Sequence, residues 1–301
     1  MLNCYPYETV NKVAIAFKYR DLSFLWLKEL NNSALTHPCM SESERHYPIS
    51  EQLFNERILF VVIGLHRRAG RPPLISHYQI FCAIFFILRT GIPWRDLPGV
   101  YGNWHTIYTR FKRWCEWGWF WQLLYALQST RPVKVEVAWI DSTYIILHRH
   151  GSGALKSKGK QSIGRGRKGS GTKIHIGLSP KQLKAACLSP AQDTDMKAFP
   201  VLWEAGNWEK TNHIVGDKGY DSANARQPMR EAGIKPVIPR KINAPIPGVQ
   251  EPEIYKTRVK IEHFFGHIKE LKRMALRCDK LDLTFFSFFA MACIKVLKLL
   301  C

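Results

Sequence analysis

The sequence lacks the long uninterrupted apolar run that a membrane-spanning helix requires. Residues 80–88 are too few to span a bilayer, and Lys295 and Lys298 interrupt the apolar run that starts at Leu283. The first residues also lack the basic start and apolar stretch of a signal peptide. No internal repeat is visible. These absences argue against a transmembrane or secreted protein, and we expect a cytoplasmic location.

Cysteine is present, but not at the spacing of a metal site. None of the eight cysteines forms a Cys-x-x-Cys pair, and no histidine stands at a zinc-ligand interval from them. We therefore expect reduced thiols, which are typical of proteins in the cytoplasm. His148 and His150 lack a third partner, so we interpret them as surface residues.

Acidic residues are scarce relative to basic ones. The chain has 44 Lys and Arg against 24 Asp and Glu, which gives a net charge of +20. So basic a protein associates with polyanions, and its charge alone fits nucleic acid or an anionic membrane surface equally well. The charge therefore predicts a class of partner but no activity. Hydrophobic residues make up 46% of the 301 residues, enough for one large domain or two smaller ones.

The stretch 255–269 is predicted to form one helix that carries four polar residues on a single face. Tyr255, Arg258, Glu262 and Lys269 stand at offsets of zero, three, seven and fourteen. At about 100° per residue these offsets fall within an arc of about 60° and span about 21 Å. The apolar residues are expected to face a core: Ile261, Phe264, Ile268 and Leu271.

Two aspartates upstream stand where strands are predicted. Asp141 interrupts a β-branched and aromatic run at 135–147, and Asp217 ends a short apolar strand before a Gly turn. With Glu262 they would form a hard oxygen site suited to Mg²⁺ or Mn²⁺, next to cations that can hold a polyanion. The alternatives are a turn-forming or helix-capping role for each Asp and an ordinary solvated face for the helix.

These motifs resemble those of the DDE transposases of bacterial insertion sequences, in the group that covers insertion-sequence families four and five. The helix signature of that group is Tyr, two residues, Arg, three residues, Glu, six residues, Lys. The chain reproduces it with Tyr255, Arg258, Glu262 and Lys269. Residues 140–143 and 216–221 are similar to the motifs around the first two acids of the family. Residues 88–98 and 104–114 look like its DNA-binding region.

The resemblance implies an α/β fold: a ribonuclease-H-like catalytic domain with a mixed sheet, in which two sheet acids meet a helix acid. An all-helical, helix-turn-helix-like DNA-binding domain would precede it. We place the DNA-binding domain at 45–130 and the catalytic domain at 131–301, with no large insertion between Asp217 and Glu262. Residues 1–44 are interpreted as an extension of unknown role, or as an upstream start with Met40 as an alternative initiator.

The resemblance also implies the chemistry and the partners. Asp141, Asp217 and Glu262 would be catalytic and would hold two divalent ions, Mg²⁺ or Mn²⁺, while Tyr255, Arg258 and Lys269 would position DNA. The partners would be double-stranded DNA, as terminal inverted repeats and target, and further copies of the chain in a homodimer or larger assembly on the nucleoid. Three further polar residues are secondary candidates: His213, Asp221 and Glu270.

Residues 49–128 show helical periodicity. Helices are predicted at 50–66, 76–90, 103–115 and 119–127, with Asn103 as an N-cap. In the third of these, aromatic residues recur at helical spacing beside Arg110, Lys112 and Arg113. That pattern suits a recognition helix. It suits equally an apolar core with a solvated basic face.

After residue 135 the sequence pattern indicates both strands and helices. We predict a strand through Asp141, a hairpin at 179–182 with a strand at 183–188, a helix at 196–205, a helix interrupted near Pro228 and a strand at 236–239. A basic loop at 149–173 contains seven glycines and no acid. We expect it to lie along a phosphate backbone, the alternative being a solvated loop without a role. Its cations are Lys156, Lys158, Lys160, Arg165, Arg167 and Lys168.

The sequence therefore predicts a transposase that binds the ends of an insertion sequence and catalyses metal-dependent DNA cleavage and strand transfer. Two other functions stay open. One is a catalytically decayed protein that still binds DNA, against which the three intact acids argue. The other is a ribonuclease-H-like nuclease without transposition, which only an end-specific joining activity would distinguish.

Overall fold

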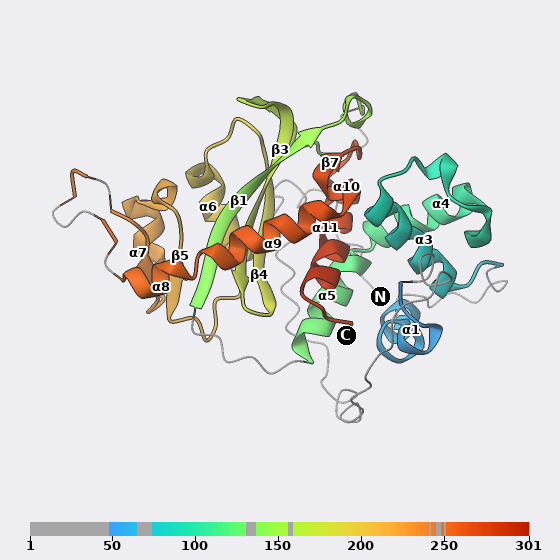
Figure 1. Cartoon of the computed structure of the whole chain (residues 1–301), viewed down its shortest axis with the longest axis horizontal. Coiled ribbons are helices and arrows are strands. Elements are labelled where there is room, and N and C mark those ends of the chain that lie inside the picture. Colours follow the sequence, from blue (N-terminus) through green and yellow to red (C-terminus); the bar gives the residue numbers. More distant parts are fainter. Residues whose placement is uncertain are drawn as a thin grey trace, which may run out of the picture. The chain divides into compact units, whose positions relative to one another are not determined.

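The computed structural model describes residues 48–64, 74–130, 137–155, 159–240, 242–244, 248–249 and 251–300. They divide into two compact units (Figure 1). The sheet unit comprises residues 137–152 and 161–266, and the helical unit comprises the remaining described residues. Residues 267–300 thus group with the N-terminal helices, whereas the functional boundary expected near residue 131 stays a prediction. Within the described part of the chain, no helix is both long and apolar enough to cross a membrane.

Two helices of the helical unit, α3 and α4, begin and end close to the residues that the sequence predicts. Ser76 caps α3 in a reciprocal capping box with Gln79, and Gly91 closes it in the left-handed conformation at φ 72°. Asn103 caps α4 as predicted. The helices are α1 (Glu51–Arg57), α2 (Leu59–Gly64), α3 (His77–Thr90), α4 (Trp104–Glu116), α5 (Trp119–Ser129), α10 (Lys272–Ala275) and α11 (Asp282–Val296), with a short strand β7 (Leu276–Arg277).

The prediction of one helix over 50–66 is wrong. The helix is distorted at Ile58, where φ is −118° although the residue stays in the right-handed region, so that α1 and α2 are separate elements. This part of the chain contains three β-branched residues, Ile58, Val61 and Val62, whose restricted side chains make a continuous helix less favourable. His66, at the predicted end, lies outside the described residues.

Aromatic side chains form the core of the helical unit. Phe111 of α4 stacks against Phe288 of α11 with ring centroids 4.7 Å apart, and Trp121 of α5 lies 4.4 Å from Phe286. Trp114 is fully buried as well. Phe111 and Trp114 of α4 are therefore core residues, whereas Trp104 at the start of the helix is half-buried.

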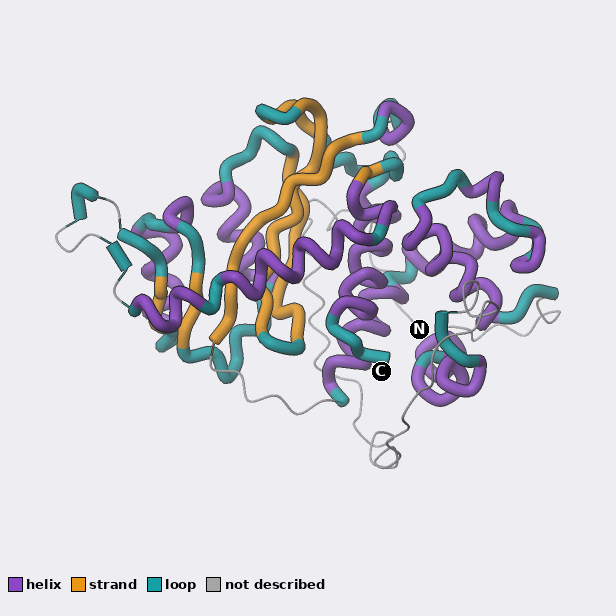
Figure 2. Tube along the Cα trace, in the orientation of Figure 1, coloured by secondary structure: helices purple, strands orange, loops and turns teal. Residues whose placement is uncertain are grey.

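The sheet unit is built on a mixed sheet (Figure 2). Strands β1, β3 and β4 are antiparallel neighbours, while β5 runs parallel to β1 and β6 runs parallel to β5. This arrangement confirms the ribonuclease-H-like α/β fold. The strands are β1 (Val137–Leu147), β2 (Gly164–Gly166), β3 (Gly169–Ser179), β4 (Gln182–Pro190), β5 (His213–Val215) and β6 (Lys235–Val237).

Side chains alternate between the two faces of β1. Ala138 and Ile140 join a buried cluster with Phe199 and Leu202 of α6 (Asp195–Ala205) and with residues of α7 (Ala223–Glu231). Trp139 points to the other face, where its Nε1 donates to Thr257 Oγ1 at 2.8 Å. The two faces of the strand are therefore covered by different helices.

Two local predictions in the sheet unit need correction. Helix α7 continues through Pro228 without an interruption. The basic segment is not a simple loop, because β2 pairs with the start of β3 and Thr172 Oγ1 donates to the carbonyl of Ser162. Antiparallel pairing satisfies the backbone polar groups of this Gly-rich stretch. Between Asp217 and Glu262 the described residues contain no element larger than α7, as expected.

Candidate active site

The parallel pairing of β1 and β5 brings Asp141 and Asp217 to equivalent positions. Trp139 pairs with Val215, the last residue of β5, and each aspartate stands two residues further along its strand direction. Gly216, between β5 and Asp217, packs closely against β1, since a Cβ atom there would lie 3.1 Å from Cγ1 of Ile140. The two acids therefore lie next to each other, Asp141 within β1 and Asp217 just beyond the end of β5, and we call this place the sheet edge.

Glu262 joins this edge through Arg258. The guanidinium of Arg258 donates to Asp141 Oδ2 at 2.8 Å and to Glu262 Oε1 at 2.5 Å. Asp141 is mostly buried, with 13% of its side chain exposed, whereas 53% of the Glu262 side chain is exposed. One arginine thus links the buried strand acid to the solvent-exposed helix acid.

The prediction of one continuous helix over 255–269 is wrong. Helix α8 (Pro252–Lys256) ends in a turn at Thr257 and Arg258, and α9 (Val259–Glu270) begins after it. Thr257 is held by Trp139, and its own hydroxyl donates to the carbonyl of Ile254 at 2.6 Å. Docking of this turn on β1 breaks the helix. The apolar face of α9 is nevertheless buried as predicted, at Ile261, Phe264 and Ile268.

The break changes how the signature residues are placed. Tyr255 is half-buried at the end of α8, Arg258 lies in the turn and Glu262 lies in the first turn of α9. Lys269 is exposed near the end of α9, in the part that groups with the helical unit. The regular 21 Å stripe expected from the sequence is therefore not formed, but Arg258 and Glu262 still meet.

Electrostatics single out Asp141. Burial raises the pKa of its carboxyl from 3.8 to about 6, and this outweighs the opposing effects of the Ser142 N–H and of Arg258. Asp217 and Asp195 raise it further by repulsion. Burial, together with Asp195, Asp141 and Asp217, also raises the pKa of Tyr220, whose buried hydroxyl has no hydrogen-bond partner among the described residues. Negative charge is thus concentrated here beyond what Arg258 neutralises.

A polar network on the opposite face of β1 was missed by the sequence interpretation. Asp195 Oδ1 accepts hydrogen bonds from Ser142 Oγ at 2.9 Å and from Lys173 Nζ at 3.0 Å. His175 is fully buried beside it, and burial lowers its pKa to about 4, which keeps the ring neutral. Ser142 and Asp195 are 53 residues apart, so no local pattern could have joined them.

The secondary candidates all have other partners. His213 Nε2 lies 3.6 Å from Glu251 Oε2, and His267 lies 3.0 Å from Glu270. Asp221 forms an ion pair with Arg226 at 2.8 Å. None of these contacts involves the three predicted catalytic acids.

The carboxylates at the sheet edge have the chemistry of a divalent-ion site, but their side chains do not surround one point. No group of three His, Cys, Asp or Glu side chains stands close enough to hold one ion in the part of the chain that the structure describes. Arg258 instead bridges Asp141 and Glu262, and its buried Nε has no hydrogen-bond partner among the described residues. Carboxylate oxygens are preferred ligands of Mg²⁺ and Mn²⁺, and a divalent ion would offset both the burial of the Asp141 carboxylate, which is the main cause of its raised pKa, and the smaller repulsion from Asp217 and Asp195.

The other predicted DNA-contacting cations are on α4 and in the basic segment. On α4, Lys112 and Arg113 are exposed and Arg110 is half-buried, with its pKa lowered by burial and by Arg113. In the basic segment the described cations are exposed: Lys160, Arg165, Arg167 and Lys168. Lys156 and Lys158 lie outside the described residues. The exposed cations of α4 and of the basic segment are on the surface, so contact with DNA stays a prediction.

Two family models match the chain. Residues 134–297 match the transposase DDE domain, and residues 56–124 match the putative transposase of IS4/5 family. The first match spans more than half of the sequence, so the chain belongs to the DDE transposase family. It is a DDE transposase of the insertion-sequence type, and membership of this family implies action on DNA with the help of a divalent metal ion.

Individual relatives agree with this assignment. The chain is 34% identical over 104 residues to an uncharacterized protein, y4sN, of Sinorhizobium fredii, in a match that covers 35% of this chain and 81% of that protein. It is 32% identical over 84 residues to a putative transposase for insertion sequence element IS6501 of Brucella ovis, covering 27% of this chain and 63% of that protein.

Similarity to solved structures is remote. A pre-cleavage Mos1 transpososome matches with 11% identity and a TM-score of 0.26, over 77% of this chain and 81% of that one. The Mos1 mariner paired end complex with Mn matches with 12% identity and a TM-score of 0.27, over 82% and 83%. These values are too low to carry an argument about this chain.

Proposed function

We propose that this transposase binds the ends of its insertion sequence and carries out cleavage and strand transfer at Asp141, Asp217 and Glu262. The supporting observation is the geometry of the sheet edge. The register of β1 and β5 aligns the two aspartates, and Arg258 links Asp141 to Glu262. This geometry supports assigning the three acids to one site, although they are distant in sequence.

The residues of the site have distinct tasks in this proposal. Two Mg²⁺ or Mn²⁺ ions held by the three carboxylates would supply activation of water or of a DNA 3′-hydroxyl and stabilisation of the leaving oxygen. Arg258 gives up its contacts with the carboxylates and turns its two-pronged guanidinium to the non-bridging oxygens of the scissile phosphate. Tyr255 and Lys269 position the DNA strand.

Helix α4 and the basic segment supply affinity. Lys112 and Arg113 contact the DNA ends, while Arg165, Arg167 and Lys168 follow the phosphate backbone. The domain that recognises the ends is residues 45–130, and the assembly is a homodimer or larger, because two ends must be held together. The chain works in the cytoplasm on the nucleoid.

The test is a cleavage assay on labelled DNA that flanks the chain's own gene. With Mg²⁺ we expect cuts at defined positions, followed by joining of the new 3′-hydroxyl to target DNA, and EDTA should abolish both. Binding without cuts under all metal conditions would favour the decayed DNA-binding protein. Cuts without end specificity or joining would favour a nuclease.

A further inference from the structure

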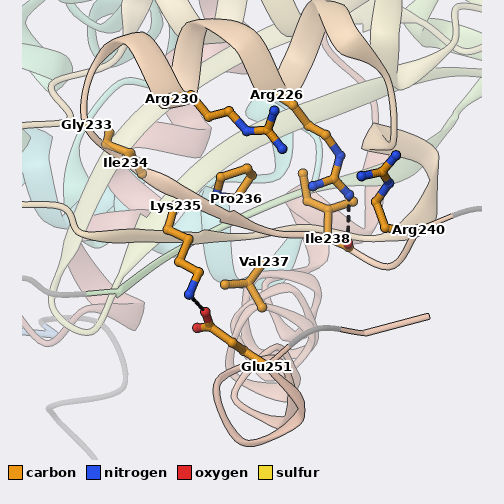
Figure 3. A pocket seen from close by; sticks show the side chains of 10 residues that line it. All are labelled: Arg226, Arg230, Gly233, Ile234, Lys235, Pro236, Val237, Ile238, Arg240 and Glu251. Carbon is orange, nitrogen blue, oxygen red and sulfur yellow. Dashed lines mark hydrogen bonds and ion pairs between the residues drawn. The ribbon is translucent and has the colours of Figure 1, made fainter. Parts of the chain in front are cut away.

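Three arginines of the sheet unit converge on a hollow that does not include Asp141, Asp217 or Glu262, the three residues of the proposed carboxylate site. The hollow lies between α7 and β6 and has a volume of about 460 Å³. Arg226, Arg230 and Arg240 line one side of it, and Lys235 and Glu251 lie opposite (Figure 3). A second hollow, on the Asp221 side, is lined by the same three arginines.

Two of these arginines are organised by one carboxylate. Arg226 donates from Nε to Asp221 Oδ1 and from Nη2 to the carbonyl of Ile238, both at 2.8 Å, and only 10% of its side chain is exposed. Arg240 Nε lies 3.5 Å from the same oxygen of Asp221 but makes no hydrogen bond. Asp221 therefore fixes the orientation of the Arg226 guanidinium, lies near that of Arg240 and neutralises one charge.

The arginines leave hydrogen-bond donors unused. In the described part of the chain, the Arg230 side chain has no hydrogen bond or ion pair, and Arg240 Nε is buried without an acceptor. The remaining carboxylate, Glu251, is engaged by Lys235 and His213. A pocket with unused guanidinium donors and excess positive charge suits an anion with several oxygens, and phosphate has the matching geometry.

The pocket is connected to the carboxylate site by one turn. Asp217 caps a 3₁₀ turn at Lys218–Tyr220, and Asp221 ends it. At about 2.0 Å per residue this turn separates the two aspartates by about 8 Å. Nucleotides of one strand advance about 3.4 Å along the helix axis. A strand held at Asp217 that continues toward Asp221 would therefore reach the arginines within a few nucleotides.

We propose that Arg226, Arg230 and Arg240 form a binding pocket for one backbone phosphate of DNA, a few nucleotides from the scissile phosphate. This assignment rests on the proposed function, because it requires that DNA is cut at Asp217. Arg226 is the fixed base of the pocket, and Arg230 and Arg240 donate to the phosphate oxygens. The pocket holds the strand in register with the carboxylates rather than taking part in the chemistry.

The test compares two double variants of the full chain that remove the same charge. Arg230→Gln with Arg240→Gln empties the pocket but leaves the Arg226–Asp221 pair intact. Lys181→Gln with Lys210→Gln removes two exposed cations of the same unit outside the pocket. Binding to a duplex from the DNA flanking the gene is measured against salt, and then with a neutral methylphosphonate at successive positions.

The pocket variant, Arg230→Gln with Arg240→Gln, should bind the duplex about tenfold more weakly. Its binding constant should also depend less steeply on salt, with a slope smaller by about one, as for one lost phosphate contact. One methylphosphonate, a few nucleotides from the cut, should weaken binding by the wild type and by the control but not by the pocket variant. Arg230→Gln alone, which breaks no contact within the described chain, should show the same pattern more weakly if folding of the double variant is impaired.

The assignment fails if both double variants keep the same slope, or if the pocket variant stays sensitive at every methylphosphonate position. Such a result, with metal-dependent cutting by the wild type intact, leaves the proposed function standing. If the wild-type chain neither binds nor cuts this DNA, both the pocket and the proposed function are wrong.

Discussion

The charged residues of the carboxylate site are held by partners, whereas those of α4 stand on the outside of an apolar core. Asp141 is mostly buried and contacts Arg258, which also holds Glu262. On α4, Phe111 and Trp114 are buried in the helical unit, and Lys112 and Arg113 are exposed. The first arrangement fixes charges relative to one another, while the second leaves them free to meet a partner.

This difference indicates two uses of charge. Fixed, partly buried charges stabilise a transition state because no reorganisation is needed when charge develops at the reacting phosphate. Exposed charges act through counterion release and raise affinity without setting geometry. If the comparison is right, substitutions in the carboxylate site should change rates and substitutions on α4 should change binding.

The largest effects should follow loss of a carboxylate. Asp141→Asn, Asp217→Asn and Glu262→Gln keep the side-chain shape but remove charge that holds metal, so cleavage should fall by about a thousandfold or more. DNA binding should change little. Single-turnover cleavage at saturating protein, alongside a binding titration, measures both. Retained cleavage in any one variant would remove that residue from the site.

The next test sets Arg258 against Arg113. Arg258→Ala should lower the rate of strand transfer by about a hundredfold at saturation and leave affinity for uncut ends nearly unchanged, because its charge matters most in the transition state. Arg113→Ala, and likewise Arg110→Ala, should weaken end binding while saturating protein restores the rate. Each variant is titrated against labelled ends. If Arg258→Ala and Arg113→Ala behave alike, the comparison is wrong.

A smaller effect is expected from the basic segment. Replacing its described cations, Lys160, Arg165, Arg167 and Lys168, by Gln should weaken DNA binding by about ten- to a hundredfold and flatten its salt dependence. The rate at saturation should be unchanged. Binding measured over a range of salt concentrations decides the matter. An unchanged slope would mean that this segment does not contact DNA.

The smallest effect is on stability. Because the folded pKa of Asp141, about 6, lies above its ordinary 3.8, the folded chain loses stability as pH rises through that interval. In EDTA, Asp141→Asn should therefore raise the free energy of unfolding by about 2 kcal/mol at pH 7 and change it little near pH 3. Denaturant unfolding measures this.

Glu204→Gln is the matched control, since Glu204 is an exposed carboxylate on α6. It should show no gain at either pH. An Asp141→Asn variant that is no more stable than wild type at pH 7 would mean that Arg258 compensates the burial of this carboxylate fully.

Local patterns predicted much of the fold. Ser76, Gly91 and Asn103 act as helix caps, and residues 179–182 form the turn of a hairpin, because these features depend on neighbouring residues. The break between α8 and α9 could not be predicted in this way. It depends on the hydrogen bond of Trp139 to Thr257, which are 118 residues apart.

The site shows the same limit. The acids were found because their motifs match a family, but the network around Asp195 has no motif. Thr194 and Asp195 look like an ordinary helix start, and Thr194 does cap α6. Only the folded sheet brings Asp195 to Ser142 and Lys173. Buried polar contacts between distant elements are the part of a site that sequence patterns do not record.

The central claim is that Asp141, Asp217 and Glu262 hold divalent metal at one site. Its most direct test is a Mn²⁺ titration of the full chain on DNA ends, followed by electron paramagnetic resonance, for the wild type and the three carboxylate variants. We predict that wild type and Lys181→Gln bind Mn²⁺ alike, and that Asp141→Asn, Asp217→Asn and Glu262→Gln each lose binding. Undiminished Mn²⁺ binding by all three variants would contradict the account.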